Sequence, residues 1–149
     1  MEILMVLPYP PSPIRVRPYG LLQALAQRGH RVRVLAVQPP EDRWADPGPL
    51  RDLGVEIRLF PLSRPRTLWN ALRAWARGEP LQAGYADHPG LREALWQALH
   101  ERWEVVHVEH LRGVGFAQEV PPERLVFDAV DSITRLFAQA RALAPGRLT

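Results

Sequence analysis

Two short segments carry the residue types that could bind or transform a ligand. One is a proline-rich loop that holds two arginines, Arg15 and Arg17. The other holds a carboxylate, an imidazole and a third guanidinium group, at Glu109, His110 and Arg112. Guanidinium groups pair with anions such as phosphate, and a histidine beside them is a candidate acid or base. The two segments therefore predict an anion-binding site with an acid–base group, provided that the fold brings them together.

Both segments directly follow predicted β-strands. Residues 2–7 and 104–109 are short apolar runs, typical of strands that are buried on both faces of a parallel sheet. In the strand order 3-2-1-4-5 the first and fourth strands are neighbours, so the loops 8–17 and 109–115 face one crevice at the topological switch point. Helix N-termini beside this crevice also favour an anion, and a glycine lets the backbone approach a ligand. The predicted ligand contacts are Pro11, Ser12, Arg15, Arg17, Arg112 and Gly113.

Five strand-like runs alternate with helical patterns along the chain. This alternation predicts an α/β fold: a doubly wound parallel sheet of Rossmann type, with helices on both faces, in a single three-layer domain. The other strands are expected at residues 31–37, 55–60 and 124–127, and the helices at residues 18–28, 67–77, 90–102 and after residue 131. Residues 38–53 and 78–89 show no period, and we expect irregular loops there, with a short helical turn at residues 49–53.

The helix at residues 67–77 has apolar side chains at helical spacing, and this side is predicted to be buried. These side chains are Leu68, Trp69, Leu72, Trp75 and Ala76. On the other side of the same helix, Asn70, Arg73 and Arg77 are predicted to face solvent. Two further helices are each predicted to bury one side, formed by Leu91, Leu95, Ala98 and Leu99 in the first, and by Ile133, Leu136, Phe137 and Ala140 in the second.

Composition narrows the class of protein. With 149 residues, of which 46% are hydrophobic and 23% charged, the chain is predicted to form one soluble globular domain. All nineteen basic residues are arginine, which excludes Schiff-base chemistry on a lysine. The absence of cysteine excludes disulfides, thiolate catalysis and cysteine-bound zinc. The net charge of +3 is spread along the chain, so no nucleic-acid partner is expected.

The location follows from the absence of targeting signals. No apolar stretch approaches the roughly 18 residues needed to span a bilayer. The basic residues follow the first apolar run rather than precede it, which is unlike a signal peptide. We therefore expect a cytoplasmic protein, including a peripheral position at the inner face of the membrane.

Familiar binding and catalytic motifs are absent. The first strand is followed by PYPPSPIRVRPYG, which contains neither the glycine pattern of a dinucleotide fold nor a P-loop. No G-x-S-x-G sequence marks a hydrolase nucleophile, and no acidic pair of a receiver domain follows the first strand. The HVEH sequence at residues 107–110 could supply metal ligands, but no third clear ligand exists elsewhere, so neither a metal nor a cofactor is expected. His107 is expected to be a hydrogen-bonded histidine within the sheet.

Three segments, in this order, resemble a known enzyme family. The opening MEILMVLPYPPSPIRVRPYGLLQALAQRGHRVRVL resembles the N-terminus of glycosyltransferase family 4 and related GT-B enzymes, in which a strand, a loop and a helix ending in RGHxV recur. EVVHVEH resembles the D-V-V-H-x-H strand end of that family. LVFDAVDSITRLFAQA resembles the segment after the fifth strand in bacterial sugar transferases of polysaccharide export clusters.

The resemblance implies a function in sugar transfer. Such enzymes move a sugar from a nucleotide-sugar to a polysaccharide, lipid-linked or small-molecule acceptor, in a cleft between two Rossmann-like domains. Residues 1–149 would form the N-terminal, acceptor-side domain, and the C-terminal donor-binding domain with its E-x7-E motif would be absent from this chain. The chain alone would then be inactive and would not bind the nucleotide-sugar. The second histidine of the family aligns with Glu109, and His110 comes one residue later; we expect His110 to be the catalytic group, with Glu109 as its rival.

Other functions remain open at this point. The same crevice could belong to a non-catalytic Rossmann-like module that binds an anionic small molecule or a partner protein. If the chain is half of an enzyme, its inter-domain face would be exposed and would cause self-association. Trp44, Trp96 and Trp103 are candidates for such a patch, although we favour core or edge packing for each.

Overall fold

The computed structural model describes residues 1–78 and 84–130 of the chain. Five strands form one all-parallel sheet in the order β3-β2-β1-β4-β5, which confirms the predicted strand order. The strands are β1 (Glu2–Leu7), β2 (Arg31–Gln38), β3 (Glu56–Pro61), β4 (Val105–Glu109) and β5 (Leu125–Asp128). The helices are α1 (Val16–Gln27), α2 (Gly48–Asp52), α3 (Arg64–Ala76), α5 (Pro89–Leu99) and α6 (Val114–Ala117), with short 3₁₀ turns η1 (Pro40–Asp42) and η2 (Leu111–Gly113).

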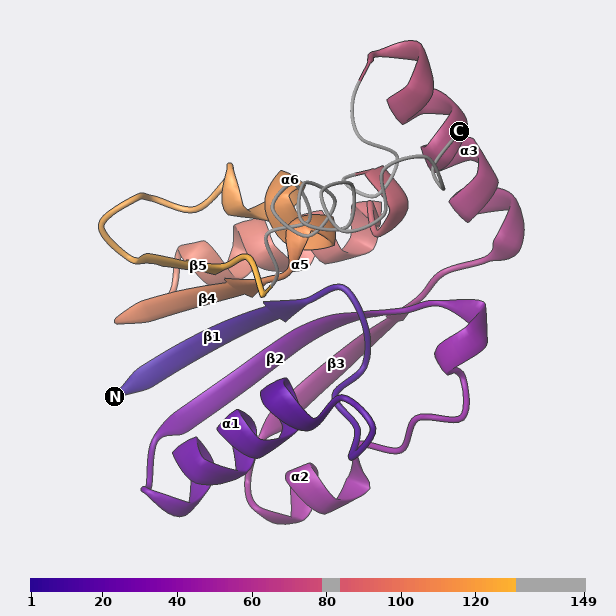
Figure 1. Ribbon diagram of the computed structural model, residues 1–149. Helices are drawn as coiled ribbons and strands as arrows, with labels where there is room; N and C mark the ends of the chain where they lie inside the picture. The colour runs from indigo at the N-terminus through magenta and orange to yellow at the C-terminus, as the bar shows by residue number, and fades with distance from the viewer. Residues whose placement is uncertain (79–83, 131–149) are drawn as a thin grey trace, which may run out of the picture.

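Two hydrophobic cores cover the two faces of the sheet. Successive side chains of a strand point to opposite faces, so β1 contributes to both cores. Met5 packs in the core on the side of α1 with Leu22, whereas Leu4 packs on the other side with Leu91 and Leu95 of α5. Figure 1 shows α1 and α2 below the sheet and α5 and α6 above it. The predicted three-layer α/β domain is therefore present, with β1 at its centre.

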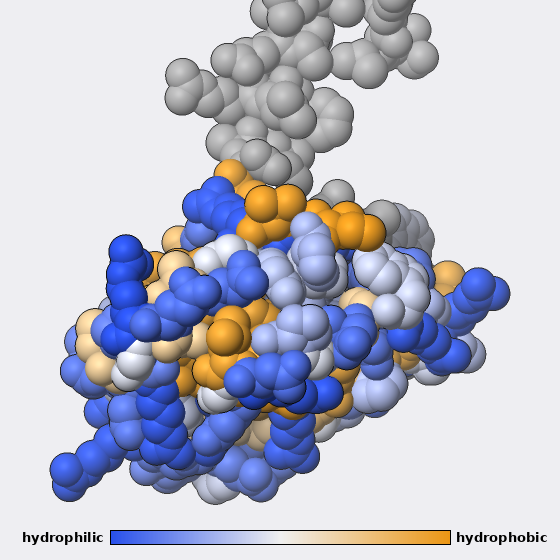
Figure 2. Space-filling view, turned by 90° about the horizontal axis from the view of Figure 1, so that it is seen from below, coloured by the Kyte–Doolittle hydropathy of each residue, from blue (hydrophilic) through white to orange (hydrophobic). Residues whose placement is uncertain are grey.

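The surface on the α1–α2 side is mainly hydrophilic. Seen from below, hydrophilic side chains cover most of this face, and hydrophobic ones show at its upper rim and in a smaller group near its middle (Figure 2). The backbone conformation at the end of α1 explains the glycine of the RGH sequence. Gly29 has φ +76°, its N–H donates to the Ala26 carbonyl, and the His30 N–H donates to the Leu25 carbonyl. This is the Schellman arrangement that ends many helices, and it favours glycine because φ is positive.

Helix α3 exposes to solvent the apolar side that was predicted to be buried. Leu68, Trp69, Leu72 and Trp75 are 73%, 57%, 52% and 71% exposed, while Asn70 is buried. The cause is the surface on which α3 packs, namely residues 84–87 rather than the sheet. The Asn70 side-chain amide donates to the Asp87 carbonyl at 2.8 Å and to the Tyr85 carbonyl at 3.4 Å. A polar contact surface therefore takes the polar side of the helix.

The same local packing involves two further residues. Arg73, predicted to face solvent, forms an ion pair with Asp87 and is partly buried. Gly84 lies so close to α3 that a Cβ atom there would come within 2.9 Å of the Ala74 Cβ atom. Helix α3 projects away from the sheet at the upper right of Figure 1. Its apolar side is therefore left without a partner among the described residues.

The remaining helical and tryptophan predictions have mixed outcomes. In α5, Leu91, Leu95 and Ala98 are buried and Leu99 packs against the same core, as predicted. Trp103 is buried as expected, but the expectation of core or edge packing is wrong for Trp44 and Trp96, which are 56% and 59% exposed. The helix expected after residue 131 lies outside the described residues. Within the described ranges, no helix is long and apolar enough to cross a membrane.

Candidate functional site

The carboxyl ends of β1 and β4 lie side by side, and one hydrogen bond joins the loop after β1 to the last residue of β4. β1 and β4 are neighbouring parallel strands, with Val6 opposite Val108. The Tyr9 hydroxyl donates to a Glu109 carboxylate oxygen at 2.8 Å, across a hundred residues of sequence. The two segments therefore meet at the switch point, and Tyr9 was not among the predicted site residues.

Glu109 is a buried carboxyl group, only 2% exposed. Burial raises the pKa of this carboxyl above its ordinary value, the hydrogen bond from Tyr9 opposes that shift, and the nearby Asp128 adds to it. Burial and the charge of Glu109 raise the pKa of the Tyr9 phenol well above its usual range, so this hydroxyl keeps its proton. Carboxyl groups with a raised pKa in a crevice are candidates for proton transfer.

His110 follows Glu109 with an unusual backbone conformation. Its φ is 69° and its ψ is 153°, a region occupied almost only by glycine, which costs a residue with a Cβ about 1–3 kcal/mol. Its Nδ1 accepts a hydrogen bond from the Arg112 N–H at 3.1 Å. In the neutral ring Nε2 therefore carries the proton. The ring stands edge-on to the Tyr9 ring, with centroids 6.2 Å apart. His110 thus belongs to the same cluster as Tyr9 and Glu109.

The strain at residue 110 predicts an inverted order of stability for two variants. His110→Gly is expected to be more stable than His110→Ala by about 1–3 kcal/mol, because only alanine keeps the Cβ that this backbone disfavours. At an ordinary helical position the order is reversed, with glycine about 0.5–1 kcal/mol less stable. Urea unfolding of both variants measures the difference, and the Gln97→Gly and Gln97→Ala pair in α5 is the control. Equal stability of the two His110 variants would argue against backbone strain.

The two arginines of the first loop are paired with carboxylates of this chain. Arg15 lies 3.3 Å from the buried Asp42, and its guanidinium stacks on the Tyr9 ring at 4.6 Å. Arg17 forms a 2.6 Å ion pair with Asp128 at the end of β5. Both arginines are held by carboxylates of this chain, so a bound anion would have to compete with Asp42 and Asp128. Neither Asp42 nor Asp128 was predicted, since each pairing depends on contacts distant in sequence.

Arg112 is the arginine of this site with an unsatisfied polar atom. Its Nε is buried and has no hydrogen-bond partner among the described residues. Its guanidinium lies over the Tyr85 ring at 4.6 Å. The Tyr85 hydroxyl donates to Glu41 at 2.6 Å, and burial together with Glu41 raises the pKa of Tyr85 to about 12. This hydrogen bond lowers the pKa of Glu41, which stays ionised. Arg112 therefore carries a buried donor without a hydrogen-bond partner among the described residues, beside the Tyr85–Glu41 pair.

The other predicted contacts shape the loops. Pro11 and Ser12 are buried, and the Ser12 carbonyl accepts a hydrogen bond from the Arg15 N–H at 2.8 Å. Gly113 is buried in η2, where a Cβ atom would come within 2.9 Å of a Val108 methyl group. Glycine at this position is thus explained by close packing on β4.

His107 points to the same face of the sheet as Glu109. It is buried within the sheet, but the expected hydrogen bond is not observed among the described residues: its Nδ1 has no partner, and its Nε2 lies 3.9 Å from an Asp128 oxygen. Burial lowers the pKa of His107, Asp128 opposes this, and Arg17 adds to it. In residues 1–78 and 84–130, no three His, Asp or Glu side chains are grouped so that they could hold a metal ion.

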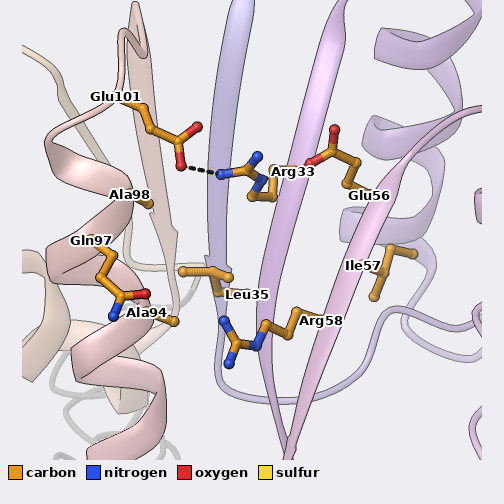
Figure 3. Close-up of a pocket in the computed structure, with 9 residues that line it drawn as sticks. All are labelled: Arg33, Leu35, Glu56, Ile57, Arg58, Ala94, Gln97, Ala98 and Glu101. Atoms are coloured by element: carbon orange, nitrogen blue, oxygen red, sulfur yellow. Dashed lines mark hydrogen bonds and ion pairs between the residues drawn. The ribbon is translucent and has the colours of Figure 1, made fainter.

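One pocket lies near this cluster, and another lies far from it. The nearer, of about 370 Å³, lies between η1 and α3 and is lined by Pro40, Glu41, Arg64, Thr67, Leu68, Ala71 and Tyr85. The second, of about 260 Å³, lies at the amino ends of β2 and β3 beside α5 (Figure 3). There Arg33 is paired with both Glu56 and Glu101, at 2.7 Å and 2.6 Å. Arg58 also lines this pocket, and its guanidinium lies over the Phe60 ring.

Sequence patterns could have indicated some of the site residues that were not predicted. Glu41 and Asp42 directly follow the second strand, and the ends of parallel strands meet at one edge of the sheet. Tyr85 precedes a helix, but no pattern places it beside Arg112.

No protein-family model matches the chain, and no curated protein or solved structure matches it significantly.

Proposed function

We propose that this chain is the acceptor-binding half of a glycosyltransferase that moves a sugar from a nucleotide-sugar to a polysaccharide, lipid-linked or small-molecule acceptor. The observation that carries the proposal is the cluster at the end of β4, where strained His110 follows buried Glu109 and both contact Tyr9. Backbone strain and raised carboxyl pKa values concentrate at functional sites. The proposal includes a donor-binding domain beyond these residues and a peripheral position at the membrane.

The chemistry of sugar transfer assigns roles to these groups. The acceptor hydroxyl forms a new bond to the sugar and loses its proton, so hydrogen-bonding groups must orient it. His110 is the group proposed to contact the transferred sugar or the acceptor, and Glu109 is its rival because it can accept a proton. Arg112 would hold a polar or anionic part of the ligand through the guanidinium group that lies over the Tyr85 ring. The neighbouring pocket beside Tyr85 would take the remainder of the acceptor.

The test separates acceptor binding from donor binding. ¹⁵N-labelled chain is titrated with alkyl glycosides and short oligosaccharides, with uridine and guanosine diphosphate sugars, and with inorganic phosphate. We expect the glycosides to shift the amide signals of Tyr9 and residues 109–113, with a Kd of the order of 1 mM. Arg112→Ala should weaken this binding about tenfold, which corresponds to about 1.4 kcal/mol. Arg102→Ala, at an exposed arginine away from the crevice, is the control and should leave the binding unchanged.

Other outcomes would contradict the proposal. Micromolar binding of a nucleotide-sugar to this chain would show that it carries the donor site. Binding of phosphate at residues 109–113 without any binding of glycosides would favour the non-catalytic, anion-binding module. Shifts that spread over the whole spectrum, or that persist unchanged in Arg112→Ala, would place the glycosides elsewhere on the protein.

A further inference from the structure

Helix α3 presents a continuous apolar surface to solvent. Leu68, Trp69, Leu72 and Trp75 lie on one side of the helix by the helical period, and each is more than half exposed. The opposite side, with Asn70, packs on residues 84–87. Two exposed tryptophans and two exposed leucines on one helix are far more than scattered surface hydrophobicity, and such patches mark interaction surfaces.

The charges around this surface all have one sign. Residues 64–78 contain four arginines and no acidic residue. Arg73 is paired with Asp87, whereas Arg64, Arg66 and Arg77 are exposed and form no ion pair with a described residue. By the helical period, Arg64 borders the apolar surface beside Trp75 and Arg66 lies beyond its other border, while Arg77 follows the last turn as the C-cap, nearer the Asn70 side. The surface is therefore apolar at its centre and cationic at its rim.

We propose that α3 docks on an anionic lipid bilayer, lying in the plane of the interface with its apolar side inserted. An amphipathic helix with tryptophan and leucine on one side and arginine along the borders has the composition of interfacial helices. Tryptophan rings concentrate at the level of the lipid headgroups, and arginines are attracted to anionic lipids. This surface faces away from the contacts that hold α3 to the protein, so docking requires no unfolding. The inference stands without the proposed sugar transfer.

Docking would also place a pocket beside the bilayer. Arg64 and Leu68 of α3 line the cavity of about 370 Å³ that reaches Tyr85 and Glu41. Leu68 therefore belongs both to the docking surface and to the wall of this cavity. A molecule anchored in the lipid could enter the cavity along α3 while its polar end lies near Arg112, whose guanidinium is stacked on Tyr85.

Vesicle flotation tests the docking. The chain is mixed with vesicles of phosphatidylcholine alone or with about 30 mol% phosphatidylglycerol, and we expect at least about tenfold stronger binding to the anionic vesicles. Raising the NaCl concentration from about 0.05 M to about 0.5 M should weaken this binding, because salt screens the arginines. The double variant Trp69→Ser/Trp75→Ser should lower binding about tenfold or more. The triple variant Arg64→Gln/Arg66→Gln/Arg77→Gln should abolish the preference for anionic lipid.

A matched control uses the other exposed tryptophans. Trp44→Ser/Trp96→Ser removes side chains that are 56% and 59% exposed but lie outside α3, and it should bind like the parent. Circular dichroism of each variant verifies that it is folded. Equal binding to neutral and anionic vesicles, or unchanged binding of the α3 tryptophan variant, would overturn the proposal. Lipid-free dimerisation that depends on Trp69 and Trp75 would show instead that a second copy covers this surface.

Discussion

Replacing Phe116 with alanine is expected to lower the free energy of unfolding by about 3–5 kcal/mol. Phe116 is only 1% exposed and belongs to the core between α5, α6 and the sheet. Its removal leaves a cavity that the surrounding strands and helices can fill only in part. Because Phe116 lies just after η2, the loss should also loosen the segment that holds Arg112. Chemical denaturation with urea measures the change, and amide exchange in residues 110–117 reports the local effect.

A second phenylalanine supplies the control for this truncation. Phe127 in β5 is 39% exposed, so Phe127→Ala removes less buried area and should cost about 1 kcal/mol. If Phe116→Ala cost no more than Phe127→Ala, the core under α6 would not be close-packed. In that case the position of η2, and with it the placement of Arg112, would have to be reconsidered.

The Tyr9→Phe variant is expected to be less stable than the parent by about 1–3 kcal/mol at neutral pH. It removes the hydroxyl that donates to Glu109 and leaves a buried carboxylate without that donor. Burial already raises the folded-state pKa of Glu109, and the hydrogen bond from Tyr9 opposes this shift. Without the hydroxyl the folded-state pKa of Glu109 should rise further.

The sign of the pH dependence follows from linkage. A carboxyl with a raised folded-state pKa carries no burial penalty below its unfolded-state pKa of about 4.3. The penalty grows as the pH rises through that value and is complete above the folded-state pKa. The difference between Tyr9→Phe and the parent should therefore be largest at neutral pH and shrink toward pH 4.3. Urea unfolding across this pH range measures it.

A double-mutant cycle attributes the effect to this pair. In the Glu109→Gln background no charge is buried at position 109, so the additional loss on Tyr9→Phe should fall below about 1 kcal/mol. A loss that is the same in both backgrounds, or that does not vary with pH, would mean that the hydroxyl stabilises the fold by some other contact.

Most of the sheet was predictable from local patterns. The apolar run of β1 was predicted with the boundaries that the structure shows, and the other four strands were predicted within one residue at each end. The strand order 3-2-1-4-5, which was a condition of the site prediction, is the order of the sheet. The RGH sequence, which contributed to the family resemblance, has a structural role here, since Gly29 ends α1 in a conformation that favours glycine.

The orientation of α3 and the partners of the arginines were not predictable in this way. The period of α3 showed correctly which side chains share a side, but the apolar side faces solvent because Asn70 meets the backbone carbonyls of residues 84–87. The pairing of Arg15 with Asp42 and of Arg17 with Asp128 joins residues that are 27 and 111 positions apart. No spacing rule connects residues at such distances.

The sequence by itself determined the class of fold and the strands of the sheet, and it indicated which two loops meet at the switch point if the strands take the order 3-2-1-4-5. Alternation and helical period are local properties, and burial of apolar runs leaves a parallel sheet as the consistent solution. Only the tertiary structure decided that Tyr9 binds Glu109, that His110 is strained and that α3 exposes two tryptophans. These features depend on which surfaces meet after folding, and long-range packing, rather than local preference, selects those surfaces.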